Sequence, residues 1–96
     1  GGLVALSKTL ARENARHNIT VNVVCPGPTD TALLAGVAEG ARDPAKLLEA
    51  FRSAIPLGRL GQPEDLANAI TFFGSDDAAF ITGQVISVSG GLTMHG

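Results

Sequence analysis

The sequence of 96 residues lacks several features that commonly reveal function, and each shortage excludes a class of protein. Its single cysteine, Cys25, excludes an internal disulfide framework and favours a reducing, cytoplasmic compartment. Only 17% of the residues are charged, against roughly 25% on average. The formal net charge of −2 indicates no basic surface for nucleic acid or for a membrane. We expect no membrane span, no secretory signal and no metal site, because long apolar runs and clusters of metal-ligating residues are missing.

Hydrophobic periodicity predicts an α/β fold. Apolar, β-branched runs predict strands over 19–25 and 84–88. Helical spacing predicts a helix from the start to about residue 15 and another over 63–73, which opens with proline and two acids. The buried face expected for this second helix consists of Leu66, Ile70 and Phe73. The order of elements predicts that the two strands are parallel and joined by a crossover.

The segment 32–60 between the first strand and the helix over 63–73 is longer than the 2–6 residues usual in such connections. Asp43-Pro44 predicts the start of a helix within it. We expect short, mobile helices that form a lid at a ligand-binding edge. The apolar lid stripe comprises Leu33, Leu34, Leu47, Leu48 and Phe51. Such a stripe suits an apolar or acyl-thioester substrate better than a sugar. Arg59, at the end of the segment, is expected to tie the returning loop to a carboxylate.

The first strand ends abruptly at Pro26-Gly27-Pro28, and two hydroxyl residues, Thr29 and Thr31, follow. In open α/β sheets, ligands bind at the carboxyl ends of the strands. Pro28 has no N–H, so Thr29 supplies the first backbone donor after the turn. Alternatively, Thr29 or Thr31 merely caps the next helix. The residues by themselves indicate part of a nucleotide or cofactor site and leave both interpretations open.

Four segments match one family pattern in order. Residues 1–11, Gly-Gly-Leu-Val-Ala-Leu-Ser-Lys-Thr-Leu-Ala, are similar to the stretch that follows a catalytic Tyr-x-x-x-Lys. Residues 21–27 carry Val-Asn-x-x-x-Pro-Gly, residues 56–65 carry Pro-Leu-Gly-Arg and Gly-Gln-Pro-Glu-Asp, and residues 81–91 carry Ile-Thr-Gly-Gln and Gly-Gly. Together they resemble the carboxyl-terminal portion of the short-chain dehydrogenase/reductase family.

The resemblance implies a Rossmann-type, doubly wound parallel sheet to which residues 1–96 contribute the last two strands with their flanking helices. It implies one carboxyl-terminal fragment of a single domain, with the lid and substrate region at about 32–60. It also implies NAD or NADP as cofactor, and hydride transfer between nicotinamide and the hydroxyl or carbonyl group of a small alcohol or ketone. Pro26, Gly27, Thr29 and Thr31 would form the cofactor site. A homo-oligomer, in many members a tetramer, is implied as well.

The sequence also departs from the family pattern. It contains no tyrosine and no glycine-rich phosphate loop, and the family's catalytic Tyr, Lys and Ser have no counterparts. No catalytic residue is therefore assigned, and the 96 residues alone are expected to be inactive. Ser89 stands where the family commonly has Asp before Gly-Gly. The alternative is a non-catalytic truncated module or assembly element of the same fold. A stand-alone binding protein is disfavoured because its first strand would expose an unpaired edge.

Overall fold

The computed structural model describes residues 2–93, apart from the side chain of Leu33. Gly1 and residues 94–96, which include His95, lie outside the described residues. Along the chain the elements are α1 (Gly2–Ala15), β1 (Val23–Pro26), α2 (Ala32–Glu39), α3 (Pro44–Ala54), α4 (Pro63–Phe73), the short 3₁₀ helix η1 (Asp76–Ala78) and β2 (Val85–Val88). The two strands pair in parallel, with Val23 opposite Val85 and Pro26 opposite Val88. The predicted α/β fold with a parallel pair is confirmed.

The strand predicted over 19–25 is shorter than expected and is observed as Val23–Pro26. The residues before it are held by one backbone bond, from the Gly83 N–H to the Val21 carbonyl at 2.8 Å, and by side chains. The Val21 N–H donates to Thr82 Oγ1 at 3.0 Å, and Asn22 Nδ2 donates to the Ile81 carbonyl at 3.1 Å. The second strand begins one residue later than predicted.

The predicted helices over 2–15 and 63–73 are confirmed, and their ends follow local preferences. α1 is followed by Asn18, whose φ of 60° lies in the left-handed region that asparagine tolerates. The long connection contains two helices. The second of them, α3, begins where Asp43 Oδ1 accepts the Lys46 N–H at 3.2 Å.

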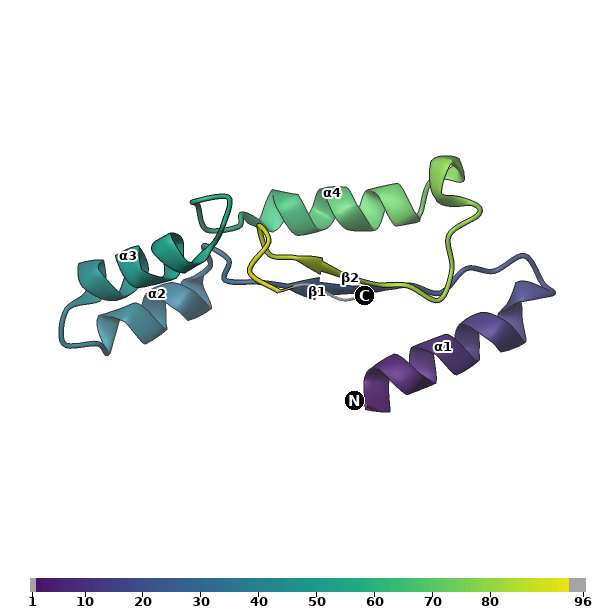
Figure 1. The fold of residues 1–96 in the computed structure, drawn as a ribbon, viewed down its shortest axis with the longest axis horizontal. Coiled ribbons are helices and arrows are strands. Elements are labelled where there is room, and N and C mark those ends of the chain that lie inside the picture. Colours follow the sequence, from purple (N-terminus) through teal and green to yellow (C-terminus); the bar gives the residue numbers. More distant parts are fainter. Residues whose placement is uncertain (1, 94–96) are drawn as a thin grey trace.

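The elements are arranged around the two strands so that α4 lies on one side and α1 on the other (Figure 1). α4 contacts both strands. α2 and α3 pack against each other and project beyond the carboxyl end of β1, as Figure 1 shows. The lid predicted for residues 32–60 therefore lies where ligands bind in open α/β sheets.

The described chain has little core of its own. Its buried residues are Ser7, Ala11, Ala38, Ile55, Ala78 and Ser89. The predicted burial of Ile70 is wrong, since this residue is 60% exposed, and Leu3 on α1 is 67% exposed. The radius of gyration is 16.2 Å, whereas about 12.5 Å is expected for a compact domain of this length. Apolar side chains such as Leu3 on α1 and Ile70 on α4 therefore remain exposed in the structure of residues 2–93.

Candidate cofactor-binding site

A hollow of about 550 Å³ lies at the carboxyl end of β1, and we call it the inner hollow. Its lining residues are Pro26, Gly27, Pro28, Thr29, Thr31, Leu34, Val37, Phe51, Pro63 and Leu66. All four residues predicted to form the cofactor site are therefore brought together. They come from the strand end and its turn, whereas the remaining wall is supplied by α2, α3 and the start of α4.

Gly27 fixes the position of the turn against the end of β2. Its N–H donates to the Val88 carbonyl at 3.0 Å. A Cβ placed on Gly27 would lie 2.6 Å from Ser89 Cβ and 2.8 Å from Ser89 Cα. Both distances are shorter than a van der Waals contact between carbon atoms. Glycine is thus required here by the close approach of two strand ends.

The serine at the family's usual aspartate position is accommodated by local hydrogen bonds. Ser89 is buried, at 8% exposure. Its Oγ accepts the Thr93 N–H at 3.1 Å and donates to the Thr93 carbonyl at 3.2 Å. A hydroxyl can do both because it carries one donor and two acceptor lone pairs.

Thr29 presents an unused backbone donor and an unused acceptor. The Asp30 N–H donates to the Gly61 carbonyl at 2.7 Å, and the Gly61 N–H donates to the Pro28 carbonyl at 2.9 Å. These bonds join the segment to Gly61 on one side, and the N–H and C=O of Thr29 have no partner within residues 2–93. The Thr29 hydroxyl donates to the Gly27 carbonyl at 2.8 Å. The backbone of Thr29 therefore offers one donor and one acceptor side by side, which matches the requirement of a carboxamide.

Thr31 is the N-cap of α2, because its Oγ1 accepts the Leu34 N–H at 3.4 Å. The capping alternative considered for this residue is therefore observed. It leaves the hydroxyl proton without an acceptor among the described residues, so the same oxygen can cap the helix and donate to a ligand. The cap fixes the position of this oxygen.

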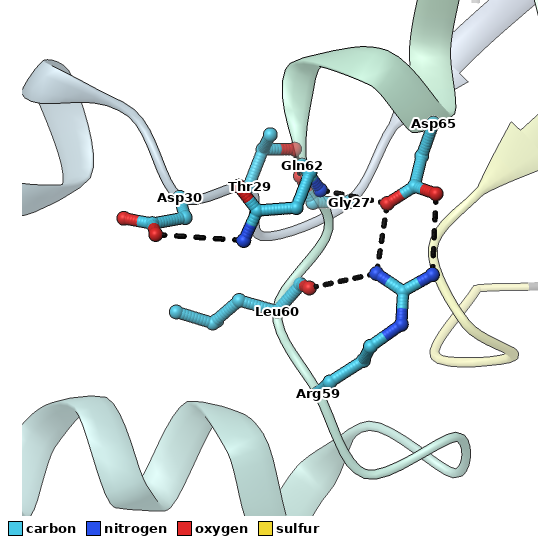
Figure 2. Close-up of polar contacts among 7 residues, drawn as sticks. All are labelled: Gly27, Thr29, Asp30, Arg59, Leu60, Gln62 and Asp65. Atoms are coloured by element: carbon cyan, nitrogen blue, oxygen red, sulfur yellow. Dashed lines mark hydrogen bonds and ion pairs between the residues drawn. The ribbon is translucent and has the colours of Figure 1, made fainter. Parts of the chain in front are cut away.

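An exposed ion pair shapes the loop that holds Gly61 (Figure 2). Arg59 donates two hydrogen bonds to Asp65, at 2.8 and 3.1 Å, and the Gln62 N–H donates to the same carboxylate at 2.7 Å. The Arg59 guanidinium, and then the Gln62 N–H, lower the pKa of Asp65 to about 2. Gln62 Nε2 reaches Asp30 at 3.5 Å, as Figure 2 shows. The expectation that Arg59 ties this loop to a carboxylate is confirmed.

The lid contributes only part of its predicted stripe to the inner hollow. Leu34 and Phe51 line it, whereas Leu47 lines a separate hollow and Leu48 is half-buried elsewhere. The Leu33 side chain lies outside what the structure describes. The prediction from sequence did not include Val37, Pro63 or Leu66. The three-residue spacing from Leu34 to Val37 is the helical signal that could have identified Val37.

The chemistry available in the inner hollow is binding rather than proton transfer. None of its lining side chains is titratable. Within residues 2–93, no group of three or more His, Cys, Asp or Glu residues could hold a metal ion. The described helices also include none long and apolar enough to cross a bilayer. The site can hold an amide through the backbone of the turn and can bury an apolar group against α2 and α3.

Comparisons with known proteins agree with this arrangement. The family described as enoyl-(acyl carrier protein) reductase matches residues 1–93. The 3-oxoacyl-[acyl-carrier-protein] reductase of Thermotoga maritima is 43% identical over 97% of the chain. The acetoacetyl-CoA reductase of Rhizobium meliloti is 46% identical over 94% of it. The chain spans about a third of these relatives, 35% of each.

A solved structure also matches nearly the whole chain. The crystal structure of an NADPH-dependent reductase involved in bacilysin biosynthesis superimposes with a TM-score of 0.89 and 35% sequence identity. The match covers 98% of this chain and 37% of that one. The strand-end turn, the helices α2 and α3 and the parallel pair thus have counterparts in a larger reductase. The chain belongs to the short-chain dehydrogenase/reductase family.

Proposed function

We propose that residues 1–96 form the carboxyl-terminal portion of a single Rossmann domain in an NAD(P)-dependent oxidoreductase, with its lid and substrate region at about 32–60. The exposed Leu3, Leu6 and Leu10 on α1 support this proposal, because a larger domain would cover them. The enzyme transfers a hydride between nicotinamide and a hydroxyl or carbonyl carbon. Because the sequence contains no tyrosine, the proton donor comes from elsewhere in the domain, and these 96 residues alone are inactive.

The cofactor proposal rests on one observation, the unpaired N–H and C=O of Thr29 at the rim of the inner hollow. Thr29 holds the nicotinamide carboxamide with this donor and acceptor, and the Thr31 hydroxyl adds a second donor. Gly27 and Pro26 set the position of the turn. A bound nicotinamide supplies or accepts the hydride, and the residues of this chain orient it and exclude water from one side.

The substrate we propose is an acyl thioester that carries a 3-oxo or 3-hydroxy group. Two of the relatives are named for reducing such thioesters, attached to acyl carrier protein or to coenzyme A. The lid side of the inner hollow is apolar, with Leu34, Val37 and Phe51 available to bury an acyl chain. We place the enzyme in the cytoplasm, which suits a chain with one free cysteine.

We further propose a homo-oligomer, a tetramer in the parent enzyme, whose subunits meet at α4 and β2. Ile70 and Phe72 on α4 are 60% and 46% exposed, and Ile86 on β2 is 39% exposed. Exposed apolar residues beside an open strand edge favour coverage by another subunit.

The cofactor proposal is tested with two substitutions at Thr29 in the whole protein that contains this chain. Thr29→Pro removes the N–H and retains the carbonyl, whereas Thr29→Ala removes only the side chain. Because the Thr29 N–H has no partner within residues 2–93, proline breaks no described hydrogen bond that alanine retains: both variants lose the bond from the Thr29 hydroxyl to the Gly27 carbonyl. We expect Thr29→Pro to weaken NAD(P) binding by about 0.5–1.5 kcal/mol relative to Thr29→Ala, the usual net value of one hydrogen bond. Titration calorimetry on variants with matched circular dichroism measures this difference. Equal affinities would refute the role of the Thr29 N–H.

The hydroxyl of Thr31 is tested separately. Thr31→Val keeps the volume and removes both the donor and the cap, and Thr31→Ser keeps both. We expect Thr31→Val to bind NAD(P) about 0.5–1.5 kcal/mol more weakly than Thr31→Ser. If the two variants bind the cofactor equally but differ in thermal stability, Thr31 is only a helix cap.

A further inference from the structure

A second hollow, of about 730 Å³, lies along the amino-terminal half of α3, and we call it the outer hollow. It is lined by Arg42, Asp43, Pro44, Lys46, Leu47 and Ala50. Two cations and one acid thus share a single concavity, in a chain whose overall charge is −2.

The two cations of the outer hollow differ from the other arginines of the lid region. Arg52 binds the Glu49 carboxylate, and Arg59 binds Asp65. No such ion pair involves Arg42 or Lys46 among the described residues. Unpaired cations that line the same hollow are available to bind an anion.

The one acid of the outer hollow has a structural role. Asp43 Oδ1 accepts the Lys46 N–H at 3.2 Å and so caps α3. Its negative charge lies at the positive end of the helix dipole, which partly offsets it. The lining side chains of the outer hollow carry a formal charge of +1, from two cations and one acid.

The outer and inner hollows share no lining residue, but both border α3, where Leu47 of the outer hollow lies one turn before Phe51 of the inner one. Phe51 lines the inner hollow, whereas the adjacent Ala50 and Leu47, one turn earlier, line the outer one. With a rise of about 1.5 Å per residue, Lys46 lies about 7.5 Å from Phe51 along the helix axis. Figure 1 shows that this amino-terminal end of α3 points away from the strands. A ligand that extends outward past Phe51 and Leu47, which share one stripe of α3, therefore reaches the hollow that Arg42 and Lys46 line.

We propose that Arg42 and Lys46 bind the phosphate of the phosphopantetheine arm of an acyl-thioester substrate. This inference rests on the proposed function, in which the acyl end lies in the inner hollow. The arm shared by coenzyme A and acyl carrier protein is a long chain that joins the thioester to a phosphate. Its uncharged part suits Leu47 and Ala50, and its phosphate is opposite in charge to the two unpaired cations.

The test compares two thioesters with the whole protein that contains this chain. Acetoacetyl-phosphopantetheine carries the shared phosphate, and acetoacetyl-N-acetylcysteamine has the same reacting group without it. The variant is Arg42→Gln with Lys46→Gln. The matched control is Arg52→Gln, which removes a charge from the same helix outside both hollows. The readout is the ratio of kcat/KM for the phosphorylated thioester to that for the other.

We expect the double variant to lower this ratio roughly three- to tenfold, the range for two partly exposed charge contacts. The control variant should leave it unchanged, and the effect should shrink in high salt because salt screens exposed charges. A third arm, acetoacetyl-CoA, identifies which phosphate is bound. An equal fall with acetoacetyl-CoA and acetoacetyl-phosphopantetheine supports binding of the shared phosphate.

A loss confined to acetoacetyl-CoA would overturn the proposal, because the nucleotide phosphates would then be the ones bound. An unchanged ratio would overturn it too, and so would an equal fall for both thioesters, which would indicate damage to the lid. These outcomes are distinct from failure of the proposed function. In that case the unsubstituted protein would reduce neither thioester.

Discussion

Substitution of Gly27 by alanine is the most direct test of how the strand ends create the site. The new methyl group would lie 2.6 Å from Ser89 Cβ and 2.8 Å from Ser89 Cα. The second of these atoms belongs to the backbone of the opposite chain segment, so no rotamer change relieves the contact. One of the two strand ends must move, and the Gly27–Val88 hydrogen bond must lengthen.

We expect Gly27→Ala to destabilise the whole protein by about 1–3 kcal/mol, the usual cost of inserting a methyl group into a filled site. The matched control is Gly36→Ala within α2, where an added Cβ has nothing within 4 Å. That substitution should stabilise by about 0.5–1 kcal/mol, because glycine in a helix costs that much relative to alanine. The same chemical change is thus expected to have opposite signs at two positions. Urea unfolding of the three proteins, with m-values compared, measures both effects.

A double-mutant cycle identifies the contact responsible. Ser89→Gly removes the Cβ at 2.6 Å but leaves the Cα at 2.8 Å, so it should recover part of the stability lost in Gly27→Ala. A coupling of at least about 0.5 kcal/mol is expected for residues in direct contact. If Gly27→Ala unfolds at the same urea concentration as the unsubstituted protein, the close approach of the strand ends is refuted, and with it our explanation of the turn.

Three further predictions concern the rest of the chain. The pKa of Asp65 in the folded protein is lowered to about 2, mainly by Arg59, so protonation of this carboxylate favours the unfolded state. The ion pair of Arg59 with Asp65 therefore stabilises the fold fully above about pH 4, and this stabilisation is lost as the pH falls toward 2. Unfolding midpoints measured from pH 2 to 5 should therefore fall less steeply for Asp65→Asn, and parallel curves would contradict this. Asn68→Glu on α4 should loosen the homo-oligomer by placing like charges across a two-fold axis, whereas Asn68→Gln should not; light scattering that finds both unchanged, or a monomeric parent, argues against this interface. Amides of residues 32–55 should exchange faster than those of Val85–Val88 in the ligand-free protein, and equally slow exchange would show that the lid is rigid.

Much of the fold could be predicted because local signals were strong. Pro63 with the acids that follow it marks the start of α4, and Gly74 marks its end, so both bounds were correct. The first strand was predicted too long because Asn22 forms its hydrogen bond with a residue 59 positions away, which no local pattern reveals. Burial of Ile70 was also wrong, since periodicity identifies an apolar face but not whether this chain supplies its partner.

The residues predicted for the cofactor site lie together around the inner hollow, but the contacts that hold them there were not all predicted. The strand end at Gly27 and the hydroxyl residues after it were identified from order along the chain. The contribution of Gly61 was not, because it pairs with the turn only after the chain has passed through two helices of the lid. The sequence did indicate one contact of this loop, because Arg59 was expected to bind a carboxylate and it binds Asp65, six positions later.

The backbone N–H groups of residues 26–31 explain why this turn suits an amide ligand. Two positions are prolines and have no N–H. Gly27 donates to β2, and Asp30 donates to Gly61. Only Thr29 and Thr31 keep an N–H without a partner among the described residues. Thr29 is half-buried and Thr31 is exposed, so these two N–H groups are open to a ligand, whereas the other two donors of the turn are already paired. The specificity of the turn therefore resides in its backbone, so substitutions that move the backbone should harm cofactor binding more than the loss of the Thr29 side chain.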